Sequence, residues 1–127
     1  MDPLPPYAQF LGIERRAGED GETLFVMPFG DTVIGRPGYL HGGAIAGLLE
    51  FAAMGAIMDA LGEAEGVTFK PINVTVNFMR GGTQHDTFAS ATVTRLGNRV
   101  ANVEPHAWQQ DRAKPIAAAQ LNVLLKR

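Results

Sequence analysis

His41-Gly42-Gly43 stands before a long apolar segment, residues 44 to 61, in which Glu50 is the only charge in about the first four turns. Apolar residues fall on nearly every face when this segment is placed on a helix, so we expect a helix buried on all sides. Glu50 then lies in the core or lines a cavity. An ionised carboxylate there is costly unless it is paired or its pKa is raised, and proteins that keep one commonly use it for chemistry.

Two glycines at the start of a helix let another group approach the backbone, and the first N–H groups of a helix have no partner within it. Together with the positive end of the helix dipole, they stabilise the oxyanion that forms when a carbonyl is attacked. The N–H of Gly42 or Gly43 is the candidate donor, and Glu50 is the candidate acid or base. For His41 two roles stay open, bracing of the loop or helix cap and acid–base chemistry.

Glu50 lies about 12 Å beyond Gly42 along the helix axis, at 1.5 Å per residue. Its side chain therefore cannot serve the start of its own helix. If two copies of the chain pair with antiparallel helices about a twofold axis, Glu50 of one copy can face the Gly42 N–H of the other. We therefore predict a homodimer with two identical sites at its interface.

The composition is that of a globular domain, and 127 residues suffice for one such domain with a core of its own. The net charge of −2 and the scattered Arg and Lys residues argue against nucleic acid or an anionic membrane surface as a partner. The absence of cysteine excludes disulfides and thiol chemistry, and it suits the cytoplasm. Glycines and Glu50 within the apolar segment argue against a membrane span. His85, Asp86 and His106 have no third ligand at a supporting spacing, so we expect no metal site.

The remaining elements read as strands, because apolar and polar residues alternate between turn-forming segments. The expected strands cover residues 14–17, 23–29, 72–79, 87–96, 100–109 and 116–125. A loop over residues 31–40 leads into the helix. We therefore predict a single α+β domain over residues 1–127, in which an antiparallel sheet of about five or six strands wraps around a long central helix.

These residues are arranged as in a known family. The features that carry the likeness are His41-Gly42-Gly43 with Glu50 behind it, the strand end Asn77-Phe78-Met79-Arg80, and the strand and turn over residues 91–99. The chain resembles the hotdog-fold acyl-CoA thioesterases of the phenylacetic-acid-degradation (PaaI-like) type over roughly residues 4 to 126. The spacing from the glycines to the acid is fairly specific, whereas the strand and turn are weak signals when taken singly.

The resemblance implies a hotdog fold, a dimer that often doubles into a tetramer, and hydrolysis of acyl-CoA without a metal or bound cofactor. It implies that the Gly42 N–H binds the thioester carbonyl, with His41 and Gly43 completing the helix entrance. Glu50 of the facing subunit would be nucleophile or general base, and the sequence does not decide between these roles. Relatives usually carry Asn or Gln about six residues before the His. Here Gly35 occupies that position, and the side chain of its neighbour Arg36 is the candidate to replace the missing Asn or Gln side chain.

In this family the CoA nucleotide lies near two features, which correspond here to the turn around residues 95–99 and to the end of the strand that reaches Arg80. The chain carries side chains there that suit phosphate groups, namely Arg80, Arg95, Asn98 and Arg99. Asn73 and Asn77 lie on the polar side of their strand, where they either line the acyl pocket or pair across an interface.

Three functions compete at this point. The leading one is hydrolysis of a small, medium-length or aromatic acyl-CoA by Glu50 and Gly42. A hotdog dehydratase or hydratase also carries a Glu in its central helix, but it needs a catalytic His in a His-Phe-Pro-like loop that this chain lacks. A non-catalytic protein that binds an acyl thioester or another apolar ligand is favoured by Gly35, and by Pro71 near a position where relatives often carry Ser or Thr.

Overall fold

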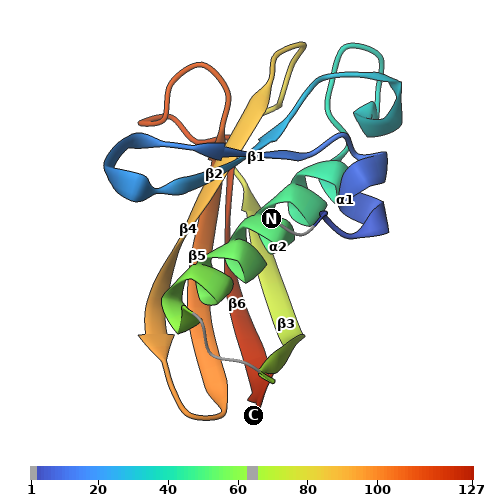
Figure 1. Cartoon of the computed structure of the whole chain (residues 1–127). Helices are drawn as coiled ribbons and strands as arrows, with labels where there is room; N and C mark the ends of the chain where they lie inside the picture. The colour runs from blue at the N-terminus through green and yellow to red at the C-terminus, as the bar shows by residue number, and fades with distance from the viewer. Residues whose placement is uncertain (1–2, 63–65) are drawn as a thin grey trace.

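The computed structural model of the chain describes residues 3–62 and 66–127. A long helix lies across one face of a six-stranded antiparallel sheet (Figure 1). The elements in chain order are α1 (Pro6–Phe10), β1 (Glu14–Ala17), a 3₁₀ turn (Glu19–Gly21), β2 (Thr23–Met27), a second 3₁₀ turn (Asp31–Val33), α2 (Gly42–Leu61), β3 (Thr68–Phe78), β4 (Thr87–Leu96), β5 (Val100–Trp108) and β6 (Ala117–Lys126). The spatial order of the strands is β1-β2-β4-β5-β6-β3. This confirms the predicted α+β hotdog architecture.

The long strands form where the sequence alternates, and a tight turn joins β4 to β5. At this turn the N–H of Gly97 donates to the carbonyl of Val100 at 3.0 Å. A Cβ atom on Gly97 would lie 2.7 Å from that carbonyl oxygen, so the turn requires glycine. The turn sets the register in which Leu96 faces Ala101 and the apolar side chains of both strands meet α2.

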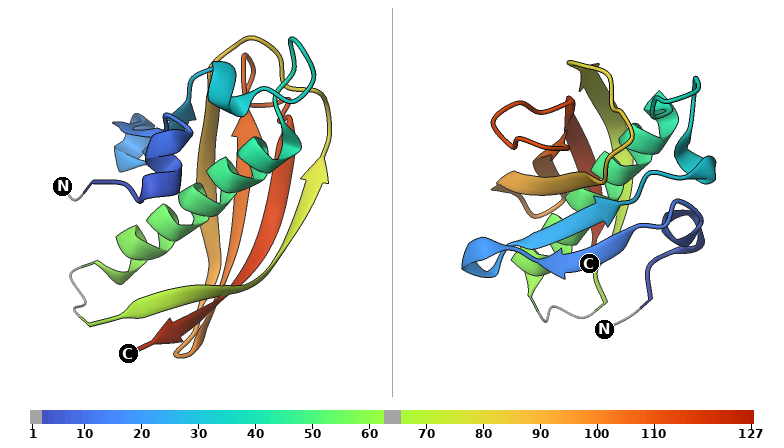
Figure 2. Two further views of the ribbon diagram at one scale, coloured as in Figure 1. Left: turned by 90° about the vertical axis from the view of Figure 1, so that its right-hand side faces the viewer. Right: turned by 90° about the horizontal axis from the view of Figure 1, so that it is seen from above.

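The helix α2 crosses the concave side of the sheet, and the two views in Figure 2 show the strands curving around it. It ends where Gly62 adopts a positive φ of 63° and its N–H donates to the carbonyls of Met58 and Asp59. The helix is long and apolar enough to cross a membrane by those two criteria alone. Here its apolar side chains pack against the sheet. The buried positions are Ala44, Ile45, Leu48, Leu49, Ala52, Ala53 and Ile57.

The prediction that α2 is buried on every face was wrong for the single chain. Met58 is 47% exposed, and Phe51 and Met54 are only partly buried. The reason is geometric, because β4, β5 and β6 cover one side of the helix, while β2 and α1 contact only parts of the rest. A row of apolar side chains is therefore left at the surface.

The edge strand β3 also differs from the prediction. It begins at Thr68 rather than Ile72, and its register against β6 shifts between Pro71 and Asn73. Proline is tolerated in a strand at an edge, where an N–H can be dispensed with. Three apolar residues of β3 remain exposed, namely Ile72 at 56%, Val74 at 44% and Phe78 at 57%.

Candidate functional site

The loop before α2 places the helix entrance. The N–H of His41 donates to the carbonyl of Val33 at 2.8 Å, and the N–H of Leu40 donates to the carbonyl of Gly82 at 3.0 Å. His41 is the N-cap residue of α2, and its Nδ1 atom accepts a hydrogen bond from the Gly43 N–H at 2.8 Å. Of the two roles left open for His41, the structure supports the helix cap.

The Gly42 N–H is the donor left over at this entrance. Within residues 3–62 and 66–127 no atom accepts a hydrogen bond from it, whereas the Gly43 N–H is taken by His41. A cavity of about 410 Å³ opens beside it, and its lining consists of Ile34, Gly35, Arg36, Tyr39, Leu40, His41, Gly42, Gly81 and Gly82. A carbonyl oxygen that enters this cavity would meet a backbone donor at the positive end of a helix.

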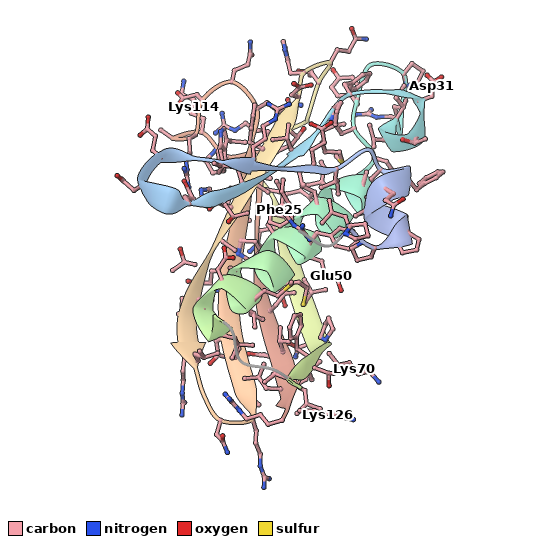
Figure 3. All side chains as sticks on the ribbon, in the orientation of Figure 1. Phe25, Asp31, Glu50, Lys70, Lys114 and Lys126 are labelled. Atoms are coloured by element: carbon pink, nitrogen blue, oxygen red, sulfur yellow. The ribbon has the colours of Figure 1, made fainter. Side chains whose placement is uncertain are left out.

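Glu50 lines a different cavity. The sequence predicted that this residue lies either in the core or at a cavity, and the second placement is the one observed. This groove of about 430 Å³ is mostly apolar, and its lining consists of Leu4, Pro5, Tyr7, Arg15, Phe25, Gly47, Glu50, Phe51, Met54, Gly55, Met58, Phe69 and Pro71. Figure 3 shows the Glu50 side chain projecting from the middle of α2. The carboxylate is half-buried, and in the described part of the chain it has no hydrogen-bond or ion-pair partner. It is therefore accessible to a substrate or a water molecule.

The two cavities have no lining residue in common. Gly42 and Glu50 lie on the same straight helix, about 12 Å apart along its axis at 1.5 Å per residue. A single chain thus carries a carbonyl-binding half-site and a carboxylate half-site that do not meet.

Arg36 lies beside the first of these half-sites. Its guanidinium carbon is 5.0 Å from the centre of the Tyr39 ring, a cation–π arrangement. At Gly35 a Cβ atom would be 3.0 Å from the Cα of His41, and the Gly35 N–H already donates to the carbonyl of Tyr39. The loop in this conformation has little room for a side chain at position 35, and the neighbouring Arg36 brings a positively charged side chain to the lining of this cavity.

The four predicted phosphate ligands lie at two opposite ends of the sheet. Arg80 follows β3 at the end where Phe78 faces Ala117, beside the entrance of α2. The other three lie around the β4–β5 turn at the opposite end, near the C-terminus (Figure 1). Arg95, Asn98 and Arg99 are exposed there, and the Asn98 carbonyl accepts a hydrogen bond from Nε of Arg127. One chain does not bring these two groups together, and their role stays a prediction.

Asn73 and Asn77 face the side of the sheet that is turned away from α2. Asn73 accepts a hydrogen bond from Asn122 at 2.9 Å, and Asn122 in turn accepts one from Asn102 at 2.5 Å. Asn77 is exposed four residues further along the same face of β3, opposite Ala118. Neither side chain lines the Glu50 groove of its own chain. Whether these two residues line an acyl pocket of the partner or pair across an interface stays a prediction.

A charged cluster that the sequence pattern does not reveal joins the residue before β2, strand β4 and the loop after β5. Arg112 donates to both carboxylate oxygens of Glu22, at 2.6 and 3.0 Å, and Ser90 donates to Glu22 as well. The guanidinium also lies 4.3 Å from the centre of the Trp108 ring. The hydrogen bond from Arg112 lowers the pKa of Glu22 to about 2. Burial, with Arg112 close by, lowers the pKa of His106.

No signal in the sequence pointed to this cluster, since Glu22 and Arg112 are 90 residues apart. The cluster lies outside the Gly42 and Glu50 cavities. Among the residues that the structure describes, no three His, Cys, Asp or Glu side chains gather in a way that could hold a metal ion.

Comparison with known proteins decides the family. The family model for the thioesterase superfamily matches residues 37–116, which is well over half of the chain and includes both Gly42 and Glu50. The chain belongs to the thioesterase superfamily. The predicted resemblance to hotdog-fold thioesterases is thereby confirmed at the level of the family.

Several known proteins are similar to the chain along most of its length. A Chromobacterium violaceum protein is 33% identical, with a TM-score of 0.75, over 96% of this chain and 84% of its own. A Bacillus halodurans protein, whose crystal structure was determined with CoA, is 22% identical, with a TM-score of 0.84, over 98% of this chain and 80% of its own. A Halobacterium salinarum protein with the provisional name of an esterase is 29% identical over 75% of this chain. The chain spans 64% of the length of that relative.

Proposed function

We propose that this protein is an acyl-CoA thioesterase that acts as a homodimer. In each site Gly42 of one subunit binds the thioester carbonyl, and Glu50 of the other subunit carries out the hydrolysis. One observation carries the proposal: the unpartnered Gly42 N–H and the accessible Glu50 carboxylate open into separate cavities on one helix. Two antiparallel copies of α2 would place each donor opposite a carboxylate.

The chemistry follows from these two groups. The Gly42 N–H would donate to the carbonyl oxygen most strongly as that oxygen gains negative charge. Glu50 would either take a proton from a water molecule that attacks the carbonyl carbon, or attack that carbon itself to give an anhydride that water then cleaves. In both cases the bond from carbon to sulfur breaks, and CoA leaves as a thiol. Neither path requires a metal ion or a resident cofactor.

The exposed apolar residues of β3 support the dimer. β3 is an edge strand, so one row of its backbone N–H and C=O groups has no partner strand within residues 3–62 and 66–127. Ile72, Val74 and Phe78 project from the same strand and are 44–57% exposed. A second copy of β3 would satisfy both the backbone groups and the apolar side chains. A dimer suffices for the proposed site, and a tetramer would be two such dimers.

The second candidate is a non-catalytic protein that binds an acyl thioester or another apolar ligand. The observation in its favour is Gly35, because the polar side chain that relatives place there is missing and the loop has little room for one. The groove beside Glu50 is apolar and would hold an acyl group in either case.

Turnover separates the two candidates. Wild type, Glu50→Gln and the control Glu104→Gln would be assayed for release of CoA thiol from a panel of short, medium and aromatic acyl-CoA esters. Glu104 is exposed on the far face of the sheet and undergoes the same loss of charge. We expect Glu50→Gln to lose roughly a hundredfold or more in kcat, as is typical when a general base is removed, and Glu104→Gln to keep the wild-type rate. Binding of these esters without any turnover by wild type would instead establish the non-catalytic candidate.

A further inference from the structure

Gln109 follows β5 and organises the loop that connects β3 to β4, residues 79–86. Its side-chain oxygen accepts a hydrogen bond from the Thr83 N–H at 2.9 Å. Its side-chain nitrogen donates to the carbonyls of Thr83 at 3.0 Å and His85 at 3.2 Å, and to the hydroxyl of the buried Thr87 at 3.2 Å. Both ends of this single amide are therefore used to hold one loop.

The same loop is in tight contact with the segment that leads into α2. The carbonyl of Gly82 accepts the Leu40 N–H at 3.0 Å. A Cβ atom on Gly82 would lie 2.5 Å from a methyl carbon of Leu40, so the Leu40 side chain packs directly on the backbone of Gly82. Gly81 likewise leaves room for the Tyr39 ring, which would lie 3.4 Å from a Cβ atom there. A shift of the 79–86 loop must therefore move the segment before the helix.

That segment fixes the Gly42 N–H, because Leu40 is separated from Gly42 only by the capping residue His41. Gly81 and Gly82 also form one wall of the Gly42 cavity. We infer that Gln109 is a positioning residue: through the 79–86 loop it holds the Gly42 N–H where a substrate carbonyl must meet it. The catalytic part of this inference rests on the proposed function, whereas the structural coupling does not.

The residue type matters because Gln109 is both donor and acceptor. In Gln109→Glu the side chain keeps its size and can still accept from the Thr83 N–H. It loses the donor, however, and places a carboxylate against the carbonyls of Thr83 and His85. The loop must then move or admit water. Displacements of about 1 Å at a reacting group can cost roughly a hundredfold in rate, even when the mutation is remote.

The first test does not depend on catalysis. The backbone amide resonances of Leu40, Gly42 and Gly82 would be compared in wild type, Gln109→Glu and the matched control Gln110→Glu. Gln110 is the exposed neighbour, and the same charge is introduced there. We expect all three resonances to move in Gln109→Glu and to stay in place in Gln110→Glu. An unmoved Gly42 resonance in a folded Gln109→Glu protein would overturn the inference, whether or not the protein is an enzyme.

The second test uses the thioesterase reaction and asks whether Gln109 acts through the Gly42 donor. We expect Gln109→Glu to lower kcat roughly ten- to a hundredfold with little change in KM. In the Gly42→Pro background, where the donor is absent, the same change should have no further effect. If the loss of kcat in the double variant equals the product of the losses in the two single variants, the inference is overturned. Should Gln109→Glu fail to fold, Gln109→Asn, which keeps the amide but shortens its reach, is subjected to the same two tests.

Discussion

The Nδ1 atom of His41 accepts a hydrogen bond from the Gly43 N–H at 2.8 Å, so an imidazole caps the start of α2. A Cβ atom on Gly43 would lie 2.9 Å from that same nitrogen, which explains why glycine stands there. Because Nδ1 is the acceptor, a neutral ring carries its proton on Nε2. The cap thus accounts for His41 and Gly43 together without any role in proton transfer.

Replacement of His41 by Asn should preserve this cap, since Asn is among the preferred N-cap residues, whereas His41→Ala removes it. We expect His41→Ala to lower the free energy of unfolding by about 0.5–2 kcal/mol and His41→Asn to lie close to wild type, as measured by urea unfolding. The assay of thioester hydrolysis then separates the two roles. An acid–base role would make both variants equally slow, while a cap lets His41→Asn retain most of the rate.

Gly42 allows a test of its N–H alone. Proline at the first helical position is well tolerated, and His41 before it already has the extended backbone, φ −72° and ψ 134°, that a residue before proline prefers. Gly42→Pro therefore removes the donor without breaking the helix, while Gly42→Ala keeps the donor. Both variants place a Cβ atom about 3.3 Å from the Phe78 ring, so this contact is matched.

We expect Gly42→Pro to lose roughly a hundredfold or more in kcat, as is typical for one lost oxyanion donor, and Gly42→Ala to lose much less. Circular dichroism and thermal unfolding confirm that both variants are folded. Equal losses in the two variants would assign the effect to the added carbon and would remove the N–H from the mechanism.

Local chemistry made much of the fold predictable. β4 runs from Thr87 to Leu96 as expected, because its alternation ends at the Gly97 turn. The helix also begins and ends near the predicted residues, since Gly42 and Gly43 are its first two residues and Gly62 ends it with a positive φ. The predicted half-sites followed from helix geometry alone, because the axial rise per residue separates two positions on one helix whatever surrounds them.

Other features depend on what lies far away in the chain. The exposure of Met58 could not be predicted from the sequence. The side of a helix that binds a second subunit has the same apolar composition as a side that faces the core of its own chain. The first residues of β3 were not predicted as strand because of Pro71. Proline usually marks the end of a strand, and it is tolerated here because β3 lies at the edge of the sheet. The pairing of Glu22 with Arg112 requires the folded sheet to bring β2 beside the loop after β5.

The ion pair of Glu22 and Arg112 predicts how stability depends on pH. The pKa of Glu22 is lowered from 4.5 to about 2, chiefly by the hydrogen bonds from Arg112. A carboxyl whose pKa is lower in the folded state stabilises the fold above its unfolded pKa, and this contribution is lost as the pH falls through the folded pKa. Because Arg112 is exposed, we expect a contribution of only about 1 kcal/mol.

Urea unfolding of wild type and Glu22→Gln between pH 7 and pH 2 measures this contribution. The difference in unfolding free energy should be constant above pH 5 and should shrink between about pH 4.5 and pH 2. Arg112→Gln, which removes the largest cause of the shift, should strongly reduce the pH dependence of that difference. A difference that is independent of pH in the wild-type background would contradict the ion pair.

The edge strand predicts a change in oligomeric state. Val74 faces the same side of the sheet as α2, and its neighbour Thr75 faces the opposite side. Val74→Lys places a charge in the apolar row that a second β3 would cover, so we expect a monomer by light scattering and no thioesterase activity. Thr75→Lys adds the same charge to the polar face and should remain a dimer. An active Val74→Lys monomer would contradict a site shared between subunits.

Mixing two inactive variants tests the shared site directly. Gly42→Pro keeps Glu50, and Glu50→Gln keeps the Gly42 N–H, so each homodimer has two defective sites. In a mixed dimer one site combines both intact groups and the other combines both defects. Random reassortment makes half of the dimers mixed, so about a quarter of the wild-type sites should be restored. The mixture, reassorted by co-refolding, is assayed for release of CoA thiol beside each variant alone. If each site were built within one chain, no mixing ratio could restore activity, because every chain in the mixture would carry one of the two defects.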